Sequence, residues 1–520
     1  MDRVEFMTEM ASGASLLDFD ATLWDVSKVR DMSLMFKDAV SFVGDDGIST
    51  WNVMSVTNVD EMFQGATSLI SDGVMSWNLT SVYTRGSILE QVLEHFESLQ
   101  TRVLNIPNLE MQGTIPDTFV SDRTEVVDLY LVQNNLTGSL PTDLVNMQNL
   151  RRVFVSENTL EGSLVIPSNA VEFQGSDNFF EGEITTDMVQ DALEILILSR
   201  NEFSGSTTTS WLNRGTLNLN HVALDHNLLS GTLSLDAMSA ISILDLSSNL
   251  FTGSLPLTLP ATIRVLKLSD NAFGGTSWFQ NVQSVSLLEE LDLSRNDLSG
   301  TIQSLAFAAL DTFIADDNRL NGVLPADIPT TVKVLSIRNN ALSGPIRDIV
   351  ATLTSLTNLR LDHNDLTGPI HLSDSHVEVL LNHNQLDGTL SQDFFTANSN
   401  LQTLYLHHNR LTGPVPATMN LAAELEHLRL DENEFTGTLP TLETLTKLKE
   451  LRMDRNSLTG PLPSGLSTML DLVHLDLANN GFTGTCSSVV FESGVLVFER
   501  KTRECQSNHS LVMTNEDNRR

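Results

Sequence analysis

A short motif that repeats along most of the chain restricts the folds that the chain can adopt. The string L-x-L-x-x-N-x-L/F-x-G recurs from about residue 129 to residue 484 of the 520 residues, with a period of about 23 residues. Such a period is typical of a solenoid, in which each coil buries its apolar side against the neighbouring coils. The sixteen asparagines of the motif, called the ladder asparagines below, are Asn134, Asn158, Asn178, Asn201, Asn227, Asn249, Asn271, Asn296, Asn318, Asn340, Asn364, Asn384, Asn409, Asn433, Asn456 and Asn480.

Each position of the motif has a mechanical role. Leucines two residues apart, such as Leu475 and Leu477, point to one face of a short strand and enter the core. The asparagine follows where the chain turns, and its amide has two donors and an acceptor for backbone groups of its own repeat and the next one. The glycine four residues later permits a left-handed turn. We therefore expect a row of asparagines that satisfies buried peptide groups along the solenoid.

A Gly-x-aliphatic-Pro sequence follows the asparagine in many copies, for example GSLP at 138–141, GVLP at 322–325 and GTLP at 437–440. This pattern resembles the plant-type leucine-rich repeat, L-x-G-x-I-P, of receptor-like kinase ectodomains and polygalacturonase-inhibiting proteins. The resemblance covers residues 104–484. It implies an α/β repeat solenoid, a right-handed leucine-rich-repeat superhelix with one parallel β-sheet on its concave face. Turns of 3-10 helix or short strand are expected on the convex face.

The first 84 residues repeat in a different pattern. Their recurring residues, 26 or 27 apart, are Trp24, Trp51 and Trp77, with the pairs Met35-Phe36 and Met62-Phe63. The segments VRDMSLMFKDAVSF and VTNVDEMFQGATSL resemble the BspA-like repeats of bacterial and protist surface proteins, which are relatives of the leucine-rich repeat. This resemblance assigns residues 1–84 to an array of their own. Because Met10-Ala11 takes the Met-Phe position of an earlier copy, we expect a segment upstream of this sequence, or a truncated gene model.

The remaining segments connect and close the two arrays. A capping-box pattern, followed by apolar residues at helical spacing, predicts an amphipathic linker helix over 85–103. Two apolar runs around a Glu-Ser-Gly turn predict a C-terminal hairpin cap over 485–505. The only two cysteines, Cys486 and Cys505, flank this hairpin and are a candidate disulfide. Residues 506–520 are polar and are predicted to be disordered.

The charge and the missing motifs exclude several classes of function. The chain has 66 acidic and 30 basic side chains, which leaves a net charge of −36, so nucleic acids and anionic membranes are disfavoured partners. No stretch of about 18 uncharged apolar residues predicts a membrane span, and the first residues do not resemble a signal peptide. No phosphate loop, nucleophile elbow, H-E-x-x-H helix or kinase motif set occurs. We therefore predict no enzyme, no catalytic residue and no cofactor.

The repeat register identifies outward-facing side chains on the expected sheet. Counting back from each ladder asparagine, positions −5 and −3 enter the core, while positions −6, −4, −2 and −1 leave it. Over the repeats of Asn364 to Asn456 these positions hold arginine and tyrosine, the types enriched in binding hot spots. The alternative is a solvated face on which Arg and Asp pair across strands and stabilise little. The candidate concave ligand-binding residues are Arg360, Asp362, Tyr405, His407, Arg429, Asp431, Arg452 and Asp454.

Histidines fall at the −1 position of three consecutive repeats. They are His363, His383 and His408, and His407 lies beside them. A row of imidazoles next to carboxylates can bind a transition metal or respond to acidification. The alternative is a set of exposed histidines without a ligand. Because neighbouring strands are spaced more widely than the ligands of one ion, we predict no metal site.

The leading interpretation is a non-enzymatic, receptor-like scaffold that binds a protein, peptide or glycan on its concave face. Two alternatives remain, an inhibitor of a secreted wall-degrading enzyme and a structural or adhesive cell-surface protein. An extracellular or cell-surface location is expected, and a cytoplasmic one stays open because the sequence shows neither signal peptide nor anchor. Three sequons permit N-glycans in a secreted chain, at Asn78, Asn135 and Asn508.

Overall fold

The computed structural model describes residues 4–14, 24–39, 48, 51–59, 62, 103–105, 112–115, 125–206, 218–346, 350–372, 374–463, 465–466, 469–483 and 512–514. The chain divides into two compact units, here unit 1 (Met1–Phe251) and unit 2 (Thr252–Arg520). Both are built from coils that each contribute one strand to a first series and one to a second series.

The first-series strands form where the alternating apolar residues of the motif lie. Each is three residues long, its middle residue is buried, and it pairs in parallel and in register with its neighbours, as Val153 does with Leu129 and Phe173. In unit 1 they are β1 (Val103–Asn105), β3 (Asp128–Tyr130), β5 (Arg152–Phe154), β7 (Glu172–Gln174), β9 (Ile195–Ile197), β11 (His221–Ala223) and β13 (Ile243–Asp245).

Unit 2 continues the same pattern of short parallel strands. Leu359 of this series and Leu361, two residues later, are fully buried, as the motif predicts. The strands are β15 (Val265–Lys267), β17 (Glu290–Asp292), β19 (Thr312–Ile314), β21 (Val334–Ser336), β23 (Asn358–Arg360), β25 (Glu378–Leu380), β27 (Thr403–Tyr405), β29 (His427–Arg429), β31 (Glu450–Arg452) and β33 (His474–Asp476).

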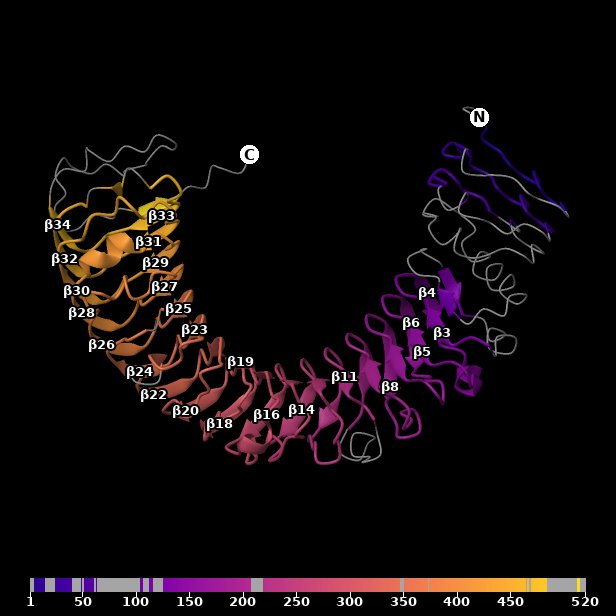
Figure 1. Ribbon diagram of the computed structural model, residues 1–520, viewed down its shortest axis with the longest axis horizontal. Coiled ribbons are helices and arrows are strands. Elements are labelled where there is room, and N and C mark those ends of the chain that lie inside the picture. The colour runs from indigo at the N-terminus through magenta and orange to yellow at the C-terminus, as the bar shows by residue number, and fades with distance from the viewer. Residues whose placement is uncertain are drawn as a thin grey trace. The chain divides into compact units, whose positions relative to one another are not determined.

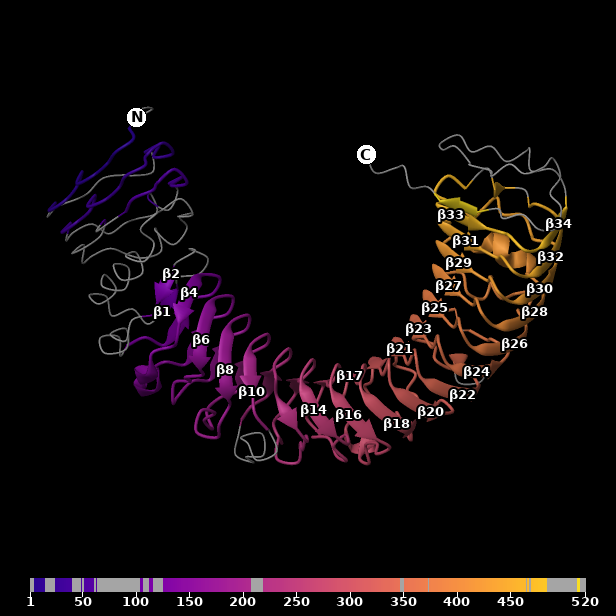
Figure 2. The ribbon, with the colours of Figure 1, turned by 180° about the vertical axis from the view of Figure 1, so that it is seen from behind.

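The second-series strands follow the ladder asparagines and form parallel pairs of their own. In unit 2 they lie on the outer side of the curve, and the first series lies on the inner side (Figure 1; Figure 2, from behind). The expected solenoid with a concave parallel sheet and short extra strands is therefore confirmed. The second-series strands are β2 (Gln112–Thr114), β4 (Asn135–Gly138), β6 (Thr159–Ser163), β8 (Phe179–Glu183), β10 (Glu202–Ser204), β12 (Ser230–Gly231), β14 (Leu250–Gly253), β16 (Ala272–Gly275), β18 (Asp297–Thr301), β20 (Arg319–Gly322), β22 (Ala341–Pro345), β24 (Asp365–Gly368), β26 (Gln385–Thr389), β28 (Arg410–Pro414), β30 (Glu434–Gly437), β32 (Ser457–Pro461) and β34 (Gly481–Thr483).

Helical structure is sparse among the described residues. The 3-10 helices that link second-series strands to the next coil are η4 (Thr142–Asn146), η7 (Val282–Ser284) and η8 (Ala417–Leu421). Each buries one apolar side chain, such as Leu144 of η4 and Met419 of η8. Such short 3-10 turns are among the connections that the resemblance implies.

The ladder asparagines join successive coils through backbone groups. The Asn158 side-chain nitrogen donates to the carbonyl oxygens of Val155 (3.0 Å) in its own repeat and Leu131 (2.8 Å) in the preceding repeat. Its side-chain oxygen accepts the backbone N–H of Leu136 (3.1 Å), again in the preceding repeat. The same arrangement recurs from Asn178 to Asn249 and from Asn296 to Asn480. The expectation of bonds to the next repeat was wrong in direction, because the turn faces the coil before it.

Left-handed backbone conformations bracket the ladder position. The residue before each ladder asparagine from Gln133 to Asn479 has a φ of 50–57°. The glycine four residues after it is also left-handed, and at Gly460 (φ 81°) an added Cβ would lie 2.6 Å from Cγ2 of Thr438 in the preceding coil. The glycine is therefore required both by the turn and by the close contact between coils.

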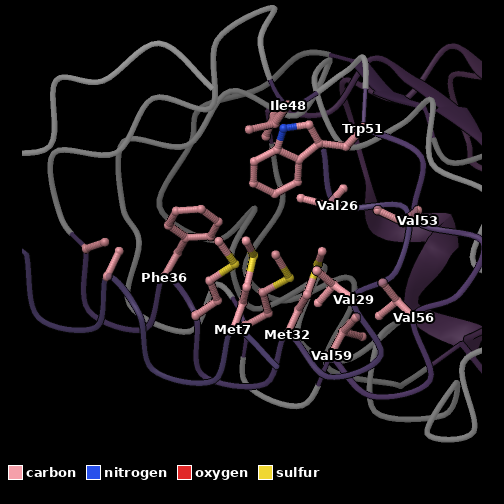
Figure 3. Packing of buried hydrophobic residues seen from close by; sticks show 14 residues of the cluster. Met7, Val26, Val29, Met32, Phe36, Ile48, Trp51, Val53, Val56 and Val59 are labelled. Carbon is pink, nitrogen blue, oxygen red and sulfur yellow. The ribbon is translucent and has the colours of Figure 1, made fainter. Parts of the chain in front are cut away.

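The N-terminal segment packs around its own apolar core, which includes Met32, Phe36 and Trp51 (Figure 3). Isolated parallel bridges connect Phe6 with Asp31 and Asp31 with Asn58, so that successive copies of the repeat lie side by side. The indoles of Trp24 and Trp51 stack with a centroid distance of 5.9 Å and an interplanar angle of 9°. The spacing of the tryptophans thus corresponds to a column of aromatic side chains.

One detail of the N-terminal repeat differs from expectation. Ala11 is buried and its N–H donates to the carbonyl of Met35, one position before the corresponding Phe36. Met10, however, is 47% exposed, whereas the corresponding Met35 is fully buried. The alignment of Met10-Ala11 with Met35-Phe36 is correct for the backbone, but the Met10 side chain does not lie in the core.

Several predictions fall outside the described residues. They concern the linker helix over 85–103 (except Val103 in β1), the hairpin cap over 485–505, the Cys486–Cys505 disulfide, and the sequons at Asn78 and Asn508. In the segment 506–520, predicted to be disordered, β35 (Val512–Thr514) pairs antiparallel with β33. A parallel sheet accepts an antiparallel strand at its edge, because unpaired backbone groups of the last strand favour pairing.

Candidate ligand-binding face of unit 2

The candidate residues of unit 2 lie on the outward face of the first-series sheet, here called the charged face. They are the last residues of β23, β27, β29 and β31, or lie two residues after these strands. At position −4 the in-register neighbours are, in order, Arg360, Leu380, Tyr405, Arg429, Arg452 and Asp476. The repeat register thus places residues far apart in sequence in one row across the sheet.

Each arginine of this row is held by a carboxylate. Arg360 donates through Nε to Glu378, and the Arg452 Nε lies 2.9 Å from Glu450 Oε1. The Arg429 guanidinium donates to both oxygens of Asp431, at 3.3 and 3.1 Å. The guanidinium groups are therefore preorganised, and a ligand that contacts them does not have to order them first.

Tyr405 lies at the centre of the row. Its hydroxyl donates to Glu450 Oε2 at 3.1 Å, two strands away, and Cζ of Arg429 lies 5.6 Å from its ring centroid. Burial, followed by the Glu450 carboxylate, raises the pKa of Tyr405 to about 12, so the hydroxyl stays protonated. Ring and hydroxyl together offer a ligand an apolar surface with one polar edge.

The −2 residues of the candidate set are buried, and the expectation that they are exposed was wrong. Asp362, His407, Asp431 and Asp454 retain 4%, 4%, 5% and 8% of their accessible surface. Alternation along a strand decides which side of the sheet a side chain leaves from, but neighbouring side chains decide its exposure. Longer side chains at −4 and −1 cover this column, as Arg429 does for Asp431.

Carboxylates accumulate toward the end of the charged face. Asp454 lies between Asp431 on one neighbouring coil and Asp476 on the other. Burial, together with the carboxylates of Asp476 and Asp431, raises the pKa of Asp454 to about 6. Burial also raises the pKa of Asp476. This end of the face therefore favours a cationic group over an anionic one.

The −1 histidines form a continuous stack instead of converging on a point. The rings of His363 and His383 are 4.2 Å apart and those of His383 and His408 are 4.1 Å apart, with interplanar angles of 24° and 19°. Ring nitrogens that ligate one ion must point at it from several directions. Within the described part of the chain, no group of three or more His, Cys, Asp or Glu residues is arranged to hold a metal ion.

Two acidic residues of the face, Glu378 and Glu450, were missed by the sequence analysis. Both begin their strands at position −6, which also leaves the core. The sequence did indicate that both glutamates face outward, because each lies two residues before the outward-facing −4 position of its strand. They were missed because Glu378 pairs with Arg360 one coil earlier and Glu450 bonds Tyr405 two coils earlier. The register of the strands does not show which side chains of different coils come into contact.

The outward face of unit 1 has a different character. Tyr130 and Phe154 stack at 4.5 Å with an interplanar angle of 5°, and Ile195 and Ile197 are half-buried on β9. Asn135, the sequon residue of this unit, is exposed at the start of β4.

Two sequence families match parts of the chain. Residues 1–101 match the family described as "Mycoplasma protein of unknown function, DUF285". Residues 287–307, 400–421 and 447–469 match the family described as "Leucine Rich Repeat". The repeats of the chain are therefore leucine-rich repeats similar to those of plant receptor-like proteins. The N-terminal match covers the segment assigned above to a separate array.

Curated relatives share part of the sequence, and solved structures share the solenoid. Receptor-like protein 31 of Arabidopsis thaliana is 34% identical over 286 residues, which are 50% of this chain and 29% of that protein. The crystal structure of a TDR receptor superposes with a TM-score of 0.71 at 24% identity, over 76% of this chain and 71% of that one. The ectodomain of the Arabidopsis receptor kinase HAESA, in complex with an IDA peptide hormone, superposes with a TM-score of 0.64 at 24% identity, over 84% and 72% of the two chains.

The match to this chain spans less than a third of the length of Receptor-like protein 31. In the part of the chain that the structure describes, no helix is long and apolar enough to cross a membrane.

Proposed function

We propose that this protein is a non-enzymatic, receptor-like recognition scaffold, and that the charged face of unit 2 binds a peptide or a peptide segment of a protein. The observation that carries the proposal is the row Tyr405–Arg429–Arg452, in which three side chains of the two hot-spot types Tyr and Arg lie on consecutive strands. The arginines are fixed by ion pairs and the tyrosine by its hydrogen bond to a carboxylate. An extended peptide can contact several of these strands at once.

Two further observations support a peptide over a nucleic acid. The outward face mixes arginines with carboxylates and carries no uniformly basic surface, which a phosphate backbone would need. The HAESA ectodomain, a solenoid of the same fold, was solved with a peptide hormone. An extracellular or cell-surface location, as in receptor-like relatives, belongs to the same proposal.

The test is a peptide-display selection against the full chain. Peptides selected on the wild type should lose binding by at least about 2 kcal/mol, or roughly thirtyfold, to the Tyr405→Ala/Arg429→Ala variant. The matched control is Arg319→Ala, because Arg319 is 72% exposed in the second-series strand β20 and pairs only with Asp297 among the ion pairs of the described residues.

The outcomes separate the possibilities. Binding that is lost in the double variant and kept in Arg319→Ala supports the site. Selected peptides that bind both variants like the wild type contradict the site, and a selection that enriches no sequence contradicts peptide binding. Circular dichroism of each variant confirms that the solenoid is intact.

A further inference from the structure

The histidine stack of unit 2 comprises the rings of His363, His383 and His408. All three residues have a left-handed backbone, with φ of 54°, 54° and 53°, which projects the rings from equivalent points of three consecutive turns. The ring separations of 4.2 and 4.1 Å are closer than the spacing of the strands below, about 4.8 Å. The imidazoles therefore lean onto one another.

A fourth histidine connects the stack to the charged face. His407 is 4% exposed, and its ring meets His383 edge-on at 5.3 Å and Tyr405 edge-on at 5.8 Å. Its Nδ1 is buried without a hydrogen-bond partner in the described structure. A change in the stack is thus transmitted by direct contact to the central tyrosine of the proposed binding row.

The charges around the stack are unevenly distributed. At its ends, His363 Nδ1 lies 3.0 Å from Asp362 Oδ2 and His408 Nδ1 lies 2.6 Å from Glu432 Oε2. These rings also face the charged groups of Asp431, Arg429 and Arg455. The carboxylate of Asp362 lies near Arg338, and that of Glu432 pairs with Arg455. His383, in the middle, has an imidazole on each side.

Protonation works against this arrangement. Two imidazolium rings about 4 Å apart repel each other, and both are partly removed from water. Burial, followed by the neighbouring His408 and His363, lowers the pKa of His383, and burial lowers the pKa of His408. The native fold therefore favours the neutral stack, and its advantage is lost as the pH falls below the ordinary histidine value of 6.5.

We propose that the histidine stack is an acid-sensitive latch on the charged face. When neutral, the stack holds the turns after β23, β25 and β27 together and keeps His407 packed against Tyr405. When protonated, the rings separate and the centre of the charged face loosens, so that a ligand bound at neutral pH is released on acidification. Only the last consequence rests on the proposed function, because the latch itself is a property of the unliganded protein.

The test follows amide hydrogen exchange of the full, unliganded chain at about pH 7.5 and about pH 5, corrected for the intrinsic effect of pH on exchange. In the wild type, protection of residues 403–409 should fall by more than about tenfold at the lower pH, because protonation opens the turns that the neutral stack holds together. In His383→Gln, which removes the central titration but leaves that of His407, it should fall by a factor at least about threefold smaller than in the wild type.

The matched control is His226→Gln. His226 also has a left-handed backbone at position −1 (φ 54°) and lies beside Asp225, but it belongs to unit 1. This variant should keep the wild-type response. A wild-type response that persists in His383→Gln, or protection that does not change with pH in the wild type, overturns the proposal.

A second measurement does not depend on a folded variant. In NMR spectra of the wild type, the Cε1–H signals of His383 and His408 should titrate with mutual coupling and below the ordinary histidine value. Two independent titrations centred on the ordinary value overturn the latch. Because neither measurement uses a ligand, its failure is distinct from a failure of peptide binding.

Discussion

In unit 1 the outward face of the first-series sheet carries the stacked pair Tyr130 and Phe154, the ion pair of Arg152 with Asp128, and Ile195 and Ile197 on β9. In unit 2 the corresponding columns carry arginines paired with carboxylates, a tyrosine and a row of histidines. Beneath both faces the ladder asparagines make the same bonds to the preceding coil. The comparison shows that the core, ladder and glycine positions determine the coil, while the outward columns vary without altering it.

The largest effect should come from the part that the two units share. Asn178→Ala in unit 1 and Asn433→Ala in unit 2 each remove the acceptor of a buried backbone N–H, that of Leu160 or Leu411, and one donor to the carbonyls of two coils. We expect each to lower the free energy of unfolding by about 3 kcal/mol, measured by denaturant titration.

The matched control for the ladder is Asn321→Ala, at an exposed position of β20 whose backbone is not left-handed. It should cost less than about 0.5 kcal/mol. Clearly unequal costs for Asn178 and Asn433 would contradict a common ladder.

The next effect should distinguish the units by pH. Burial, followed by Arg429, lowers the pKa of His407 to about 3, so the folded state favours its neutral form. Its contribution is fully present above pH 6.5 and is lost as the pH falls toward 3. Relative to the wild type, His407→Gln should therefore gain about 2 kcal/mol of stability between about pH 7 and about pH 5.

The stability of the variant must be compared with that of the wild type at each pH, because Asp454 changes the stability of both proteins in the opposite direction on acidification. Its raised pKa means that its protonation below about pH 6 stabilises the fold. His226→Gln in unit 1 serves as the control and should show no gain. An identical pH profile for His407→Gln and the wild type would show that His407 is hydrated in solution.

A smaller effect should again be equal in the two units. Gly162 (φ 80°) and Gly460 (φ 81°) are left-handed, and an added Cβ would lie 2.7 Å from Ser139 Oγ and 2.6 Å from Thr438 Cγ2 respectively. Substitution of either by alanine should cost between about 1 and 2 kcal/mol, measured by thermal unfolding.

Substitution of Gly275 distinguishes the cost of backbone strain from the cost of a close contact between coils. It has a φ of 86° but no atom within 4 Å of an added Cβ. Gly275→Ala should therefore cost about 1 kcal/mol, from the backbone alone. A cost equal to that of Gly460→Ala would show that the close approach of coils adds nothing.

The smallest effect tests the aromatic pair on the outward face of unit 1. Tyr130→Leu removes the aromatic stack with Phe154 and should cost about 1 kcal/mol of stability. Peptides selected on the wild type should bind this variant unchanged, in contrast to Tyr405→Ala/Arg429→Ala. Loss of binding on Tyr130→Leu would move the ligand site, or part of it, to unit 1.

The sequence predicted the fold closely and the site in part. The strands, the glycine turns and the row across β23 to β33 follow from the period and the alternation of the motif, because a repeat that stacks in register imposes the same position on every coil. The burial of Asp362 and Asp431 did not follow, because it depends on how far longer side chains lean over them. The bond from Tyr405 to Glu450 spans two coils, and no local pattern encodes it.

What the sequence by itself determined is the coil: where each strand lies, which residue turns the chain, and which columns face outward. These properties come from local geometry repeated many times, so one period is enough to state them. Only the tertiary structure decided what the outward columns do. It pairs the arginines, covers the −2 carboxylates and presses the histidines into a stack, because these outcomes depend on distances between side chains of different coils.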